Sequence, residues 1–286
     1  MIKRKPSWLK MKQREQQFSA TENYLSSLQL HTVCQEAHCP NQNECFSHST
    51  ATFMICGKYC TRNCTFCAVE KEKKPLPLDP NEPENVAKAV CMLGLRHAVI
   101  TSVTRDDLED GGAHHFAETI QQIRTLSPAT TVEVLIPDFE GHHDPLDVVI
   151  QSKPAVINHN IETIQDLYPK VRPGADYNRS LQVLSYAKKN GCAYTKSGFM
   201  VGLGETQEDV QHLMEELVST GCDILTIGQY LQPSLAHYPV QDYVSPVQFE
   251  NYKNMALQIG FKHIESGPLV RSSYHAKESL DHAMEE

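Results

Sequence analysis

Short apolar runs alternate with amphipathic stretches along most of this chain of 286 residues. The pattern predicts strands over residues 52–57, 97–103, 131–136, 155–159, 194–201 and 223–228, and helices over 84–94, 113–126, 145–151, 161–168, 178–190 and 207–220. Six strands that are each followed by a crossover predict a parallel sheet with right-handed connections, curved into an open (β/α)6 barrel. Functional groups of such barrels gather at the carboxyl ends of the strands, where we expect the site.

The composition is that of an ordinary soluble globular protein, with 40% hydrophobic and 21% charged residues. Ten cysteines are too few for a disulfide scaffold, so we expect a reducing compartment, with the cytoplasm as the default. The pattern of a membrane span or signal peptide is absent, so we expect no membrane association. The net charge of −9 argues against a nucleic-acid partner. Residues 1–14 are basic, which fits either attraction of an acidic partner protein or a solvated tail.

Three cysteines, Cys60, Cys64 and Cys67, follow the first predicted strand with CxxxCxxC spacing, and an aromatic residue, Phe66, precedes the last. Three thiolates can hold three irons of a [4Fe-4S] cluster and leave the fourth iron open to another ligand. A structural zinc site is the alternative, but this spacing lacks the paired CxxC knuckles that tetrahedral zinc usually takes. The spacing therefore favours a cluster with one open corner.

A second triplet, Cys34, Cys39 and Cys45, precedes that loop. From spacing alone it fits a second metal centre, a zinc site or unliganded thiols. The other four cysteines have no ligand partners in sequence, and we expect them to pack in the core: Cys56, Cys91, Cys192 and Cys222.

Polar residues at the predicted strand ends are candidates for cofactor contacts, although each also fits a structural role. Phe66 fits stacking against a ligand or core packing. Gly202, Gly204 and Glu205 allow close backbone approach to a ligand or form a strand-to-helix turn. The further candidates for cofactor contacts are Thr101, Asn158, Asn160, Glu162 and Lys196, with His159 beside them, and the candidates for substrate contacts are Arg172, Arg271 and Tyr274.

The CxxxCxxC loop with its aromatic residue, placed after the first strand of a βα barrel, resembles the radical SAM enzymes. The resemblance implies that S-adenosylmethionine (SAM) binds the open iron through its amino and carboxylate groups. One-electron reduction of the sulfonium then yields a 5′-deoxyadenosyl radical, and the protein orients the reaction.

Further stretches resemble one family within that group, the lipoyl synthases, from about Pro6 to His275. Besides the two cysteine motifs at 34–45 and 60–67, they are residues 101–108, 133–139, 158–163, 196–206 and 267–274, the last containing Arg-Ser-Ser-Tyr. The resemblance implies a radical-SAM-type barrel over 51–230, with an N-terminal extension over 1–50 and a helical C-terminal extension over 231–286. The two extensions are expected to carry an auxiliary cluster.

The same resemblance implies that Cys34, Cys39, Cys45 and Ser272 hold this auxiliary [4Fe-4S] cluster, with Ser273 as the alternative to Ser272. A serine alkoxide is a poor ligand for iron compared with a thiolate, so that corner should be labile. In the family, the auxiliary cluster donates the two sulfur atoms that are inserted at C6 and C8 of an octanoyl chain on a carrier lysine.

The resemblance also implies the partners. They are octanoylated carrier domains (the glycine cleavage H protein or the E2 domain of a 2-oxoacid dehydrogenase), an electron donor such as flavodoxin or ferredoxin, and a carrier that rebuilds the spent cluster. Two alternatives stay open at this point: another radical SAM sulfur-inserting enzyme, such as a methylthiotransferase or a biotin synthase-like protein, and a non-catalytic zinc-binding module.

Overall fold

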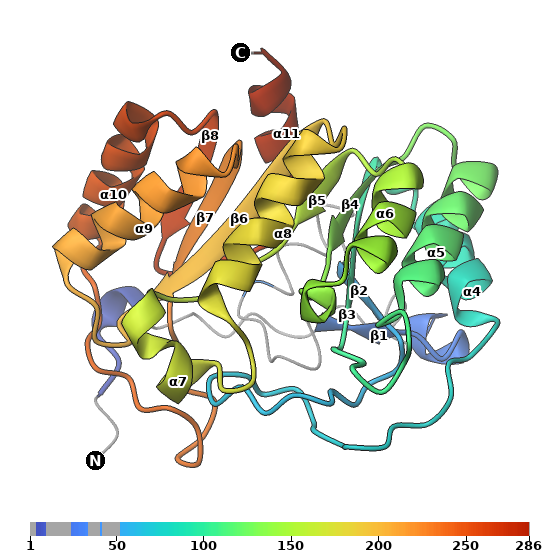
Figure 1. Cartoon of the computed structure of the whole chain (residues 1–286), viewed down its shortest axis with the longest axis horizontal. Helices are drawn as coiled ribbons and strands as arrows, with labels where there is room; N and C mark the ends of the chain where they lie inside the picture. Colours follow the sequence, from blue (N-terminus) through green and yellow to red (C-terminus); the bar gives the residue numbers. More distant parts are fainter. Residues whose placement is uncertain (1–3, 10–23, 34–40, 42–51, 286) are drawn as a thin grey trace. The chain divides into compact units, whose positions relative to one another are not determined.

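The computed structural model describes residues 4–9, 24–33, 41 and 52–285 (Figure 1). The chain groups into two compact units. Unit 1 comprises Met1–Lys12, Asn63–Cys67 and Asn158–Glu286, and unit 2 comprises Gln13–Arg62 and Ala68–Ile157. The chain passes from unit 2 to unit 1 within the cysteine loop.

Unit 2 is an α/β layer built on strands that follow one another in chain order. The strands are β1 (His31–Thr32), β2 (Thr52–Ile55), β3 (His97–Ser102), β4 (Thr131–Leu135) and β5 (Val156–Asn158), whose last residue belongs to unit 1. β1 is antiparallel to β2, and the pairs β2–β3 and β3–β4 are parallel. The helices α4 (Glu82–Met92), α5 (Ala113–Leu126) and α6 (His143–Gln151) lie side by side in Figure 1, with α5 in contact with both neighbours.

Helix α5 shows why these helices form. Phe116, Ile120 and Ile123 recur at intervals of four and three residues and are all fully buried, so one face of the helix is apolar. The helix starts after Gly112, which has a φ of 91°, a conformation that favours glycine. The three apolar side chains therefore fix the face of α5 that lies in the core.

Unit 1 repeats the same alternation with parallel strands β6 (Tyr194–Val201), β7 (Ile224–Gln229) and β8 (His263–Gly267). Its helices are α7 (Tyr168–Val171), α8 (Tyr177–Lys189), α9 (Gln207–Ser219), α10 (Pro246–Ile259) and α11 (Ala276–Glu285), and short 3-10 turns cover Ser7–Leu9 and Gln165–Leu167. α8 contacts β6, and α10 contacts both β8 and α9. The buried core includes Phe199, Leu213, Ile227 and Phe249.

Most predicted elements are confirmed to within two residues at each end, and two are matched at both ends: the strand over 194–201 and the helix over 113–126. Thr206 caps α9 as part of a capping box, accepting from the Asp209 amide at 3.2 Å. The predicted helix over 161–168 is wrong. Its first residues continue to pair with β6, since the Glu162 amide donates to the Gly198 carbonyl at 3.0 Å, and a short 3-10 turn and α7 follow.

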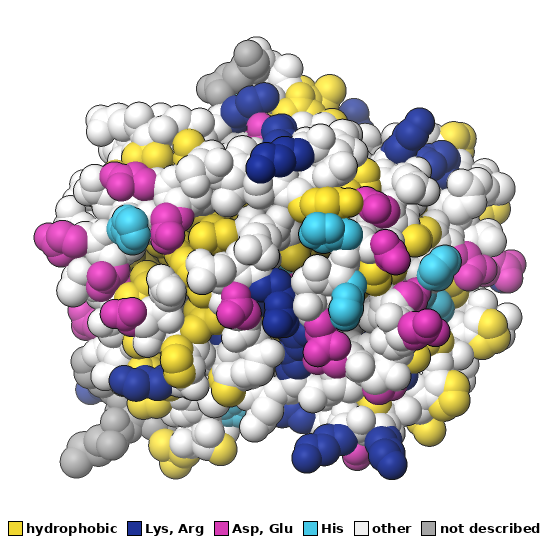
Figure 2. Space-filling view, in the orientation of Figure 1, with side chains coloured by type: hydrophobic (Ala, Val, Ile, Leu, Met, Phe, Trp, Pro, Cys, Tyr) yellow, Lys and Arg dark blue, Asp and Glu magenta, His cyan; other side chains and the backbone are white. Residues whose placement is uncertain are grey.

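Burial of the four remaining cysteines is confirmed for Cys56, Cys192 and Cys222, but Cys91 on α4 is exposed, so its prediction is wrong. In the described part of the chain, no helix is long and apolar enough to cross a membrane. On the face drawn in Figure 2, acidic and basic side chains are interspersed rather than gathered into one basic surface.

Candidate active site

The cysteine loop leaves β2 through a left-handed turn at Cys56 (φ 67°) and Gly57 (φ 84°). The Cys56 amide donates to Glu82 at 2.7 Å, and the Cys56 carbonyl accepts from the Arg105 guanidinium at 3.1 Å. Glu82 also contacts His115 at 2.7 Å, and both side chains are buried. Burial raises the pKa of the Cys56 thiol, and the charge of Glu82 adds to this. Cys56 is therefore a packed neutral thiol that shapes the start of the loop.

The first cysteine of the CxxxCxxC loop, Cys60, lies on a short backbone ladder. Its amide donates to the Glu70 carbonyl at 2.9 Å, and its carbonyl accepts from the Glu72 amide at 3.0 Å. The next residue, Thr61, donates from its amide to the carbonyl of Thr104, just after β3, at 2.9 Å. The main chain around Cys60 is thus fixed on both sides, while the residue itself is half-buried.

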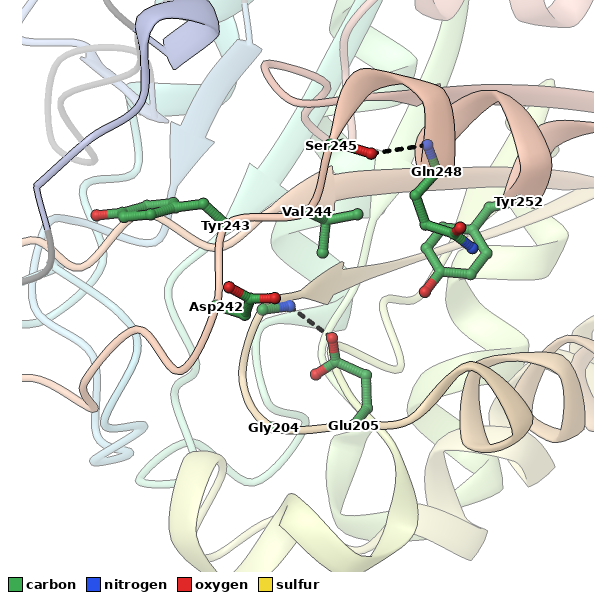
Figure 3. A pocket seen from close by; sticks show the side chains of 9 residues that line it. Gly204, Glu205, Asp242, Tyr243, Val244, Ser245, Gln248 and Tyr252 are labelled. Atoms are coloured by element: carbon green, nitrogen blue, oxygen red, sulfur yellow. Dashed lines mark hydrogen bonds between the residues drawn. The ribbon is translucent and has the colours of Figure 1, made fainter.

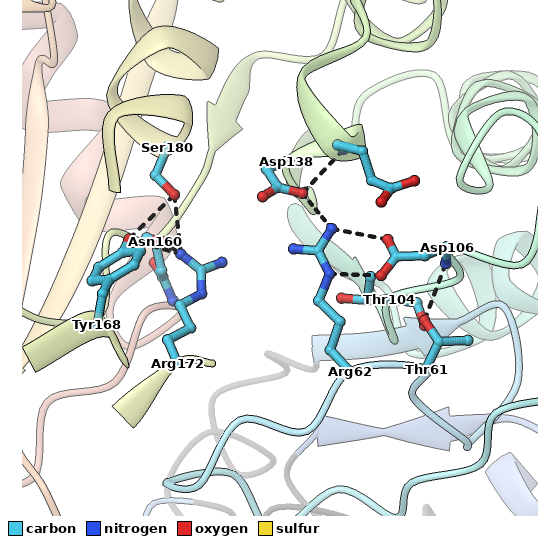
Figure 4. A network of polar contacts seen from close by, with 10 residues as sticks. Thr61, Arg62, Thr104, Asp106, Asp138, Asn160, Tyr168, Arg172 and Ser180 are labelled. Carbon is cyan, nitrogen blue, oxygen red and sulfur yellow. Dashed lines mark hydrogen bonds and ion pairs between the residues drawn. The ribbon is translucent and has the colours of Figure 1, made fainter. Parts of the chain in front are cut away.

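Arg62, between Cys60 and Cys64 in sequence, is held by two carboxylates (Figure 4). Its guanidinium donates to Asp106 at 2.7 and 2.9 Å and to Asp138 at 2.6 Å. Burial disfavours the charged guanidinium, but the hydrogen bonds to Asp106 and Asp138 outweigh it and raise the pKa of Arg62. The loop is therefore anchored to residues that follow β3 and β4, by bonds that are stronger than neutral ones.

In unit 1, the rest of the loop is held mainly through its backbone. The Thr65 amide donates to the Val171 carbonyl at 3.0 Å, and the Thr65 carbonyl accepts from the Tyr238 amide at 2.9 Å. The ring of His237 lies 3.2 Å from the Cys67 carbonyl. These bonds fix the main chain at Thr65 and Cys67.

Arg172 lies close enough to Cys64 for an electrostatic interaction between them. One terminal nitrogen of Arg172 donates to the Asn160 carbonyl at 3.1 Å, to the Tyr168 hydroxyl at 3.0 Å and to the Ser180 hydroxyl at 3.1 Å (Figure 4). Burial disfavours its charge, but Tyr168 and other nearby groups outweigh burial and raise the pKa of Arg172. Three hydrogen bonds therefore fix the Arg172 guanidinium in place.

Ser272 meets Asn160 at a glycine on β6. The Ser272 hydroxyl donates to Asn160 Oδ1 at 2.5 Å. A Cβ added to Gly198 would lie 3.0 Å from Asn160 Oδ1 and 3.3 Å from Ser272 Oγ, and would collide with the hydroxyl of Thr226 on β7. Gly198 therefore provides the space in which these polar groups come together.

Glu162, with a φ of 69°, follows Asn160 closely and accepts a hydrogen bond from its side chain. Burial raises the pKa of the Glu162 carboxyl, although the charge of Arg172 and the Asn160 hydrogen bond oppose this. The structure thus brings five of the predicted site residues together in unit 1: Cys64, Asn160, Glu162, Arg172 and Ser272.

The predicted glycine segment after β6 lines a hollow of about 380 Å³ (Figure 3). Its carboxylate, Glu205, turns back onto the segment and accepts from the amides of Gly202 at 2.5 Å and Leu203 at 3.0 Å. Burial raises the pKa of Glu205, while these backbone hydrogen bonds oppose it. Gly202 has a φ of 91°, and a Cβ there would collide with the Gln229 side chain. These contacts shape the turn itself.

The remaining predicted residues have varied surroundings. Thr101 is buried on β3 and donates to the Leu135 carbonyl at 3.0 Å. Phe66 packs against a buried cluster that includes Leu167 and Tyr230. Arg271 donates to the carbonyl of its neighbour Val270 at 2.6 Å, Tyr274 stacks on His275 with ring centres 3.9 Å apart, and Asn158, His159 and Lys196 are buried. Cys34, Cys39 and Cys45 lie outside the described residues.

The sequence analysis did not single out several residues of these networks. Arg62 itself was not a predicted site residue. Neither were the side chains that hold Arg62 and Arg172, which are those of Asp106, Asp138, Tyr168 and Ser180. A signal existed for Arg62, because a charged residue that becomes buried beside the cysteines needs a counter-charge. The two partners of Arg62 could not be predicted, because they lie 44 and 76 residues away from it along the chain.

The loop thiols suit an iron-sulfur cluster. Cys60, Cys64 and Cys67 are half-buried and outside disulfides, whereas Cys56, Cys192 and Cys222 are buried. Thiolates are the ligands that such clusters take, and Arg172 places a cation near Cys64. Within the described ranges, no group of three His, Cys, Asp or Glu residues is arranged to hold a single ion.

Comparisons with known proteins agree with this arrangement. The family model described as the radical SAM superfamily matches residues 54–217. Lipoyl synthase of Caldanaerobacter subterraneus is 55% identical over 281 residues, covering 98% of each chain, and that of Caldicellulosiruptor saccharolyticus is 56% identical with the same coverage. Lipoyl synthase of Chlorobium limicola is 54% identical over 96% of this chain and 94% of its own.

Solved structures share the fold at much lower identity. The FeFe-hydrogenase maturase HydG from Carboxydothermus hydrogenoformans is 15% identical with a TM-score of 0.59, covering 92% of this chain and 68% of that one. Methylornithine synthase is 14% identical with a TM-score of 0.54, covering 85% and 81%. The predicted fold class, an open α/β barrel of the radical SAM type, is confirmed. Because the chain is more than half identical to these lipoyl synthases over 98% of its length, it belongs to the lipoyl synthase family of the radical SAM superfamily.

Proposed function

We propose that Cys60, Cys64 and Cys67 hold the [4Fe-4S] cluster that binds SAM, and that a second cluster, held in part by Ser272, supplies sulfur. The reaction follows from the family: the enzyme uses SAM to insert two sulfur atoms at C6 and C8 of a protein-bound octanoyl-lysine, which gives the lipoyl group. The observation that carries the assignment is the set of three half-buried thiols on the loop after β2, in a chain 55% identical to a lipoyl synthase over 98% of its length.

The chain's own residues have distinct tasks in this proposal. When bound, the first cluster supplies the electron that cleaves SAM. Arg172 places a fixed cation near Cys64, and Arg62 fixes the loop between Cys60 and Cys64 through Asp106 and Asp138. We propose that SAM is surrounded by two groups of residues. They are the turn at Gly202, Gly204 and Glu205, and the side chains of Asn158, Asn160, Glu162, Lys196, Thr101 and Phe66.

Cys34, Cys39, Cys45 and Ser272 are the proposed ligands of the second cluster. Ser272 is favoured over Ser273 because its hydroxyl donates to Asn160, another predicted site residue of unit 1. The two side chains meet beside Gly198 on β6. Arg271 and Tyr274 flank it and are the proposed contacts of the acyl-lysine, together with Arg172. Arg172 is already engaged with three groups, so its proposed contact uses the guanidinium edge that those bonds leave.

The substrates of the family are octanoylated lipoyl carrier proteins. For this chain we propose the glycine cleavage H protein or the E2 domain of a 2-oxoacid dehydrogenase as the carrier. A flavodoxin or ferredoxin is the proposed electron donor, and a further carrier rebuilds the second cluster. We propose the cytoplasm as the place of the reaction, because the thiol ligands need a reducing compartment.

Two cysteine variants separate the roles of the clusters. Cys64→Ala should abolish formation of 5′-deoxyadenosine from SAM, whereas Cys39→Ala should retain cleavage of SAM and lose only the lipoyl product. Cys91→Ala, a change at the exposed cysteine of α4, is the matched control and should keep both activities. Equal loss of both activities in the Cys64 and Cys39 variants would contradict the proposed division.

A further inference from the structure

Two buried side chains meet at the start of the cysteine loop, within unit 2. Glu82 is the first residue of α4 and is 5% exposed, and His115 lies in the first turn of α5 and is 7% exposed. The Glu82 oxygen Oε2 accepts from the Cys56 amide at 2.7 Å and lies 2.7 Å from His115 Nε2. One carboxylate oxygen therefore joins α4, α5 and the residue that follows β2.

The chemistry of this oxygen fixes a hydrogen on the His115 ring. An ionised carboxylate can only accept, so His115 donates to Glu82 from Nε2. Two N–H groups, one from the ring and one from the main chain of Cys56, thus share one acceptor. Glu82→Gln keeps an oxygen that can accept both bonds, whereas Glu82→Leu has a similar size and can accept neither.

The main chain of Cys56 is bound on its other side as well. Its carbonyl accepts from the Arg105 guanidinium at 3.1 Å, and Arg105 donates to both carboxylate oxygens of Asp107 at 2.8 and 2.9 Å. A Cβ on Gly112 would lie 2.9 Å from the Cys56 sulfur, so the thiol packs tightly against the start of α5. The amide, the carbonyl and the side chain of Cys56 are therefore each fixed by a different segment of unit 2.

These contacts hold Cys56 in a conformation that residues with a Cβ rarely adopt. Its φ of 67° is left-handed, and such a conformation persists only where the surrounding structure fixes it. Residues 57–59 alone separate this turn from Cys60, the first cysteine of the CxxxCxxC loop. The turn at Cys56 therefore sets the direction in which the chain reaches Cys60.

We propose that Glu82 and His115 are positioning residues for the cysteine loop: Glu82 holds the left-handed turn at Cys56, and His115 acts through Glu82. Together they place the main chain of Cys60 before any cluster is bound. The inference rests on the proposed function and deepens it, because it names the residues that prepare the first ligand of the SAM-binding cluster. Both residues act through the main chain of Cys56, so neither is a catalytic residue.

A pair that only stabilises the core is the alternative, and unit 2 contains a pair for comparison. His97 on β3 and Glu133 on β4 lie 3.6 Å apart, with side chains 2% and 1% exposed. Glu133 lies in the middle of its strand, whereas Glu82 bonds to the residue that opens the loop. Glu133→Leu is therefore a control that matches Glu82→Leu in chemistry and burial.

The test is hydrogen exchange of the metal-free full chain, resolved to single amides under native conditions. The Cys60 and Thr61 amides report on the loop, because they donate to the Glu70 and Thr104 carbonyls and not to Glu82. Their exchange rate is expressed relative to that of the amides of α6 in the same unit, so that a change in overall stability cancels. A merely structural role of Glu82 would leave this ratio unchanged.

We expect Glu82→Leu to raise the ratio by about five-fold, which corresponds to one net hydrogen bond. Glu82→Gln and Glu133→Leu should both stay within about two-fold of the unchanged protein. His115→Phe should raise the ratio by about two- to five-fold, and adding it to Glu82→Leu should change the ratio by less than about two-fold, because His115 acts through Glu82. If Glu82→Leu does not fold, His115→Phe alone carries the test.

An unchanged ratio in Glu82→Leu would overturn the inference, and in its absence an unchanged ratio in His115→Phe would do so. An equal rise in Glu82→Gln or in Glu133→Leu would also overturn it, as would additive effects of the changes at Glu82 and His115. Failure of the proposed function looks different and is measured on the reconstituted chain. Cys60→Ala would then keep the iron content and the visible absorption of the unchanged protein, whatever the exchange rates are.

Discussion

Replacement of Arg62 by methionine tests how the cysteine loop is anchored. The Arg62 side chain is 7% exposed and lies between Asp138, which is 0% exposed, and Asp106, which is 27% exposed. Arg62→Met fills the space with an apolar chain but leaves the buried Asp138 carboxylate without the guanidinium. Removing one partner of a buried ion pair costs about 3–5 kcal/mol. Because Asp106 is partly screened by water, we expect Arg62→Met to lower the free energy of unfolding by about 3 kcal/mol.

Urea unfolding of the metal-free chain, followed by circular dichroism, measures this loss. With a dependence of about 3 kcal/mol per molar urea, the midpoint should fall by about 1 M. Adding Asp138→Asn should restore at least about half of the lost free energy, because the amide needs no counter-charge and its oxygen can still accept from the Glu140 amide. Arg124→Met, at an exposed arginine bound to two backbone carbonyls, is the control and should cost less than about 1 kcal/mol. A double variant as unstable as Arg62→Met would refute the buried-charge reasoning.

Three further predictions concern turns and caps. Thr206→Ala removes the cap of α9 and should lower the free energy of unfolding by about 1 kcal/mol, whereas Thr206→Ser should keep it. Gly202→Ala forces an alanine into a left-handed conformation and makes it collide with Gln229. Urea unfolding should show that the free energy of unfolding falls by about 2–5 kcal/mol. A smaller fall than for the same change at an exposed glycine would contradict this. Burial would raise the pKa of Asp110, but the amides of His114 and Gly112 lower it. The stability that Asp110 contributes is present above its unfolded pKa and is lost as pH falls through its folded pKa. The free energy of unfolding that Asp110→Ala loses, measured by urea unfolding, should therefore be largest near neutral pH and vanish in acid.

Periodicity was enough to predict the alternation of strands and helices. Apolar positions such as Phe116, Ile120 and Ile123 mark a helix face directly, and Thr206 marks a start. The segment after β5 was mispredicted because its apolar spacing resembles a helix. Tertiary pairing decided its structure: Glu162 takes a left-handed conformation and pairs with β6. Local sequence cannot show such a choice, because the partner strand lies more than 30 residues further along the chain.

The candidate site was predictable in some of its residues but not in its contacts. Cysteine spacing singles out Cys60, Cys64 and Cys67 as candidate ligands of one cluster. The contacts of the site are long-range: Asp138 reaches Arg62 across 76 residues, and Ser272 reaches Asn160 across 112. Such pairs leave no periodic trace in the sequence. Cys91 shows the converse error, since a helix pattern alone did not reveal which face of α4 is exposed.

The origin of the inserted sulfur tests the central claim most directly. The chain is reconstituted without oxygen using heavy-isotope sulfide, excess sulfide is removed, and one turnover is run with SAM, a reductant and an octanoylated carrier peptide. Mass spectrometry of the peptide should show two added sulfur atoms that carry the heavy isotope, and Cys39→Ala should yield none. A product with unlabelled sulfur, or labelled product from the Cys39 variant, would contradict a second cluster that serves as the sulfur source.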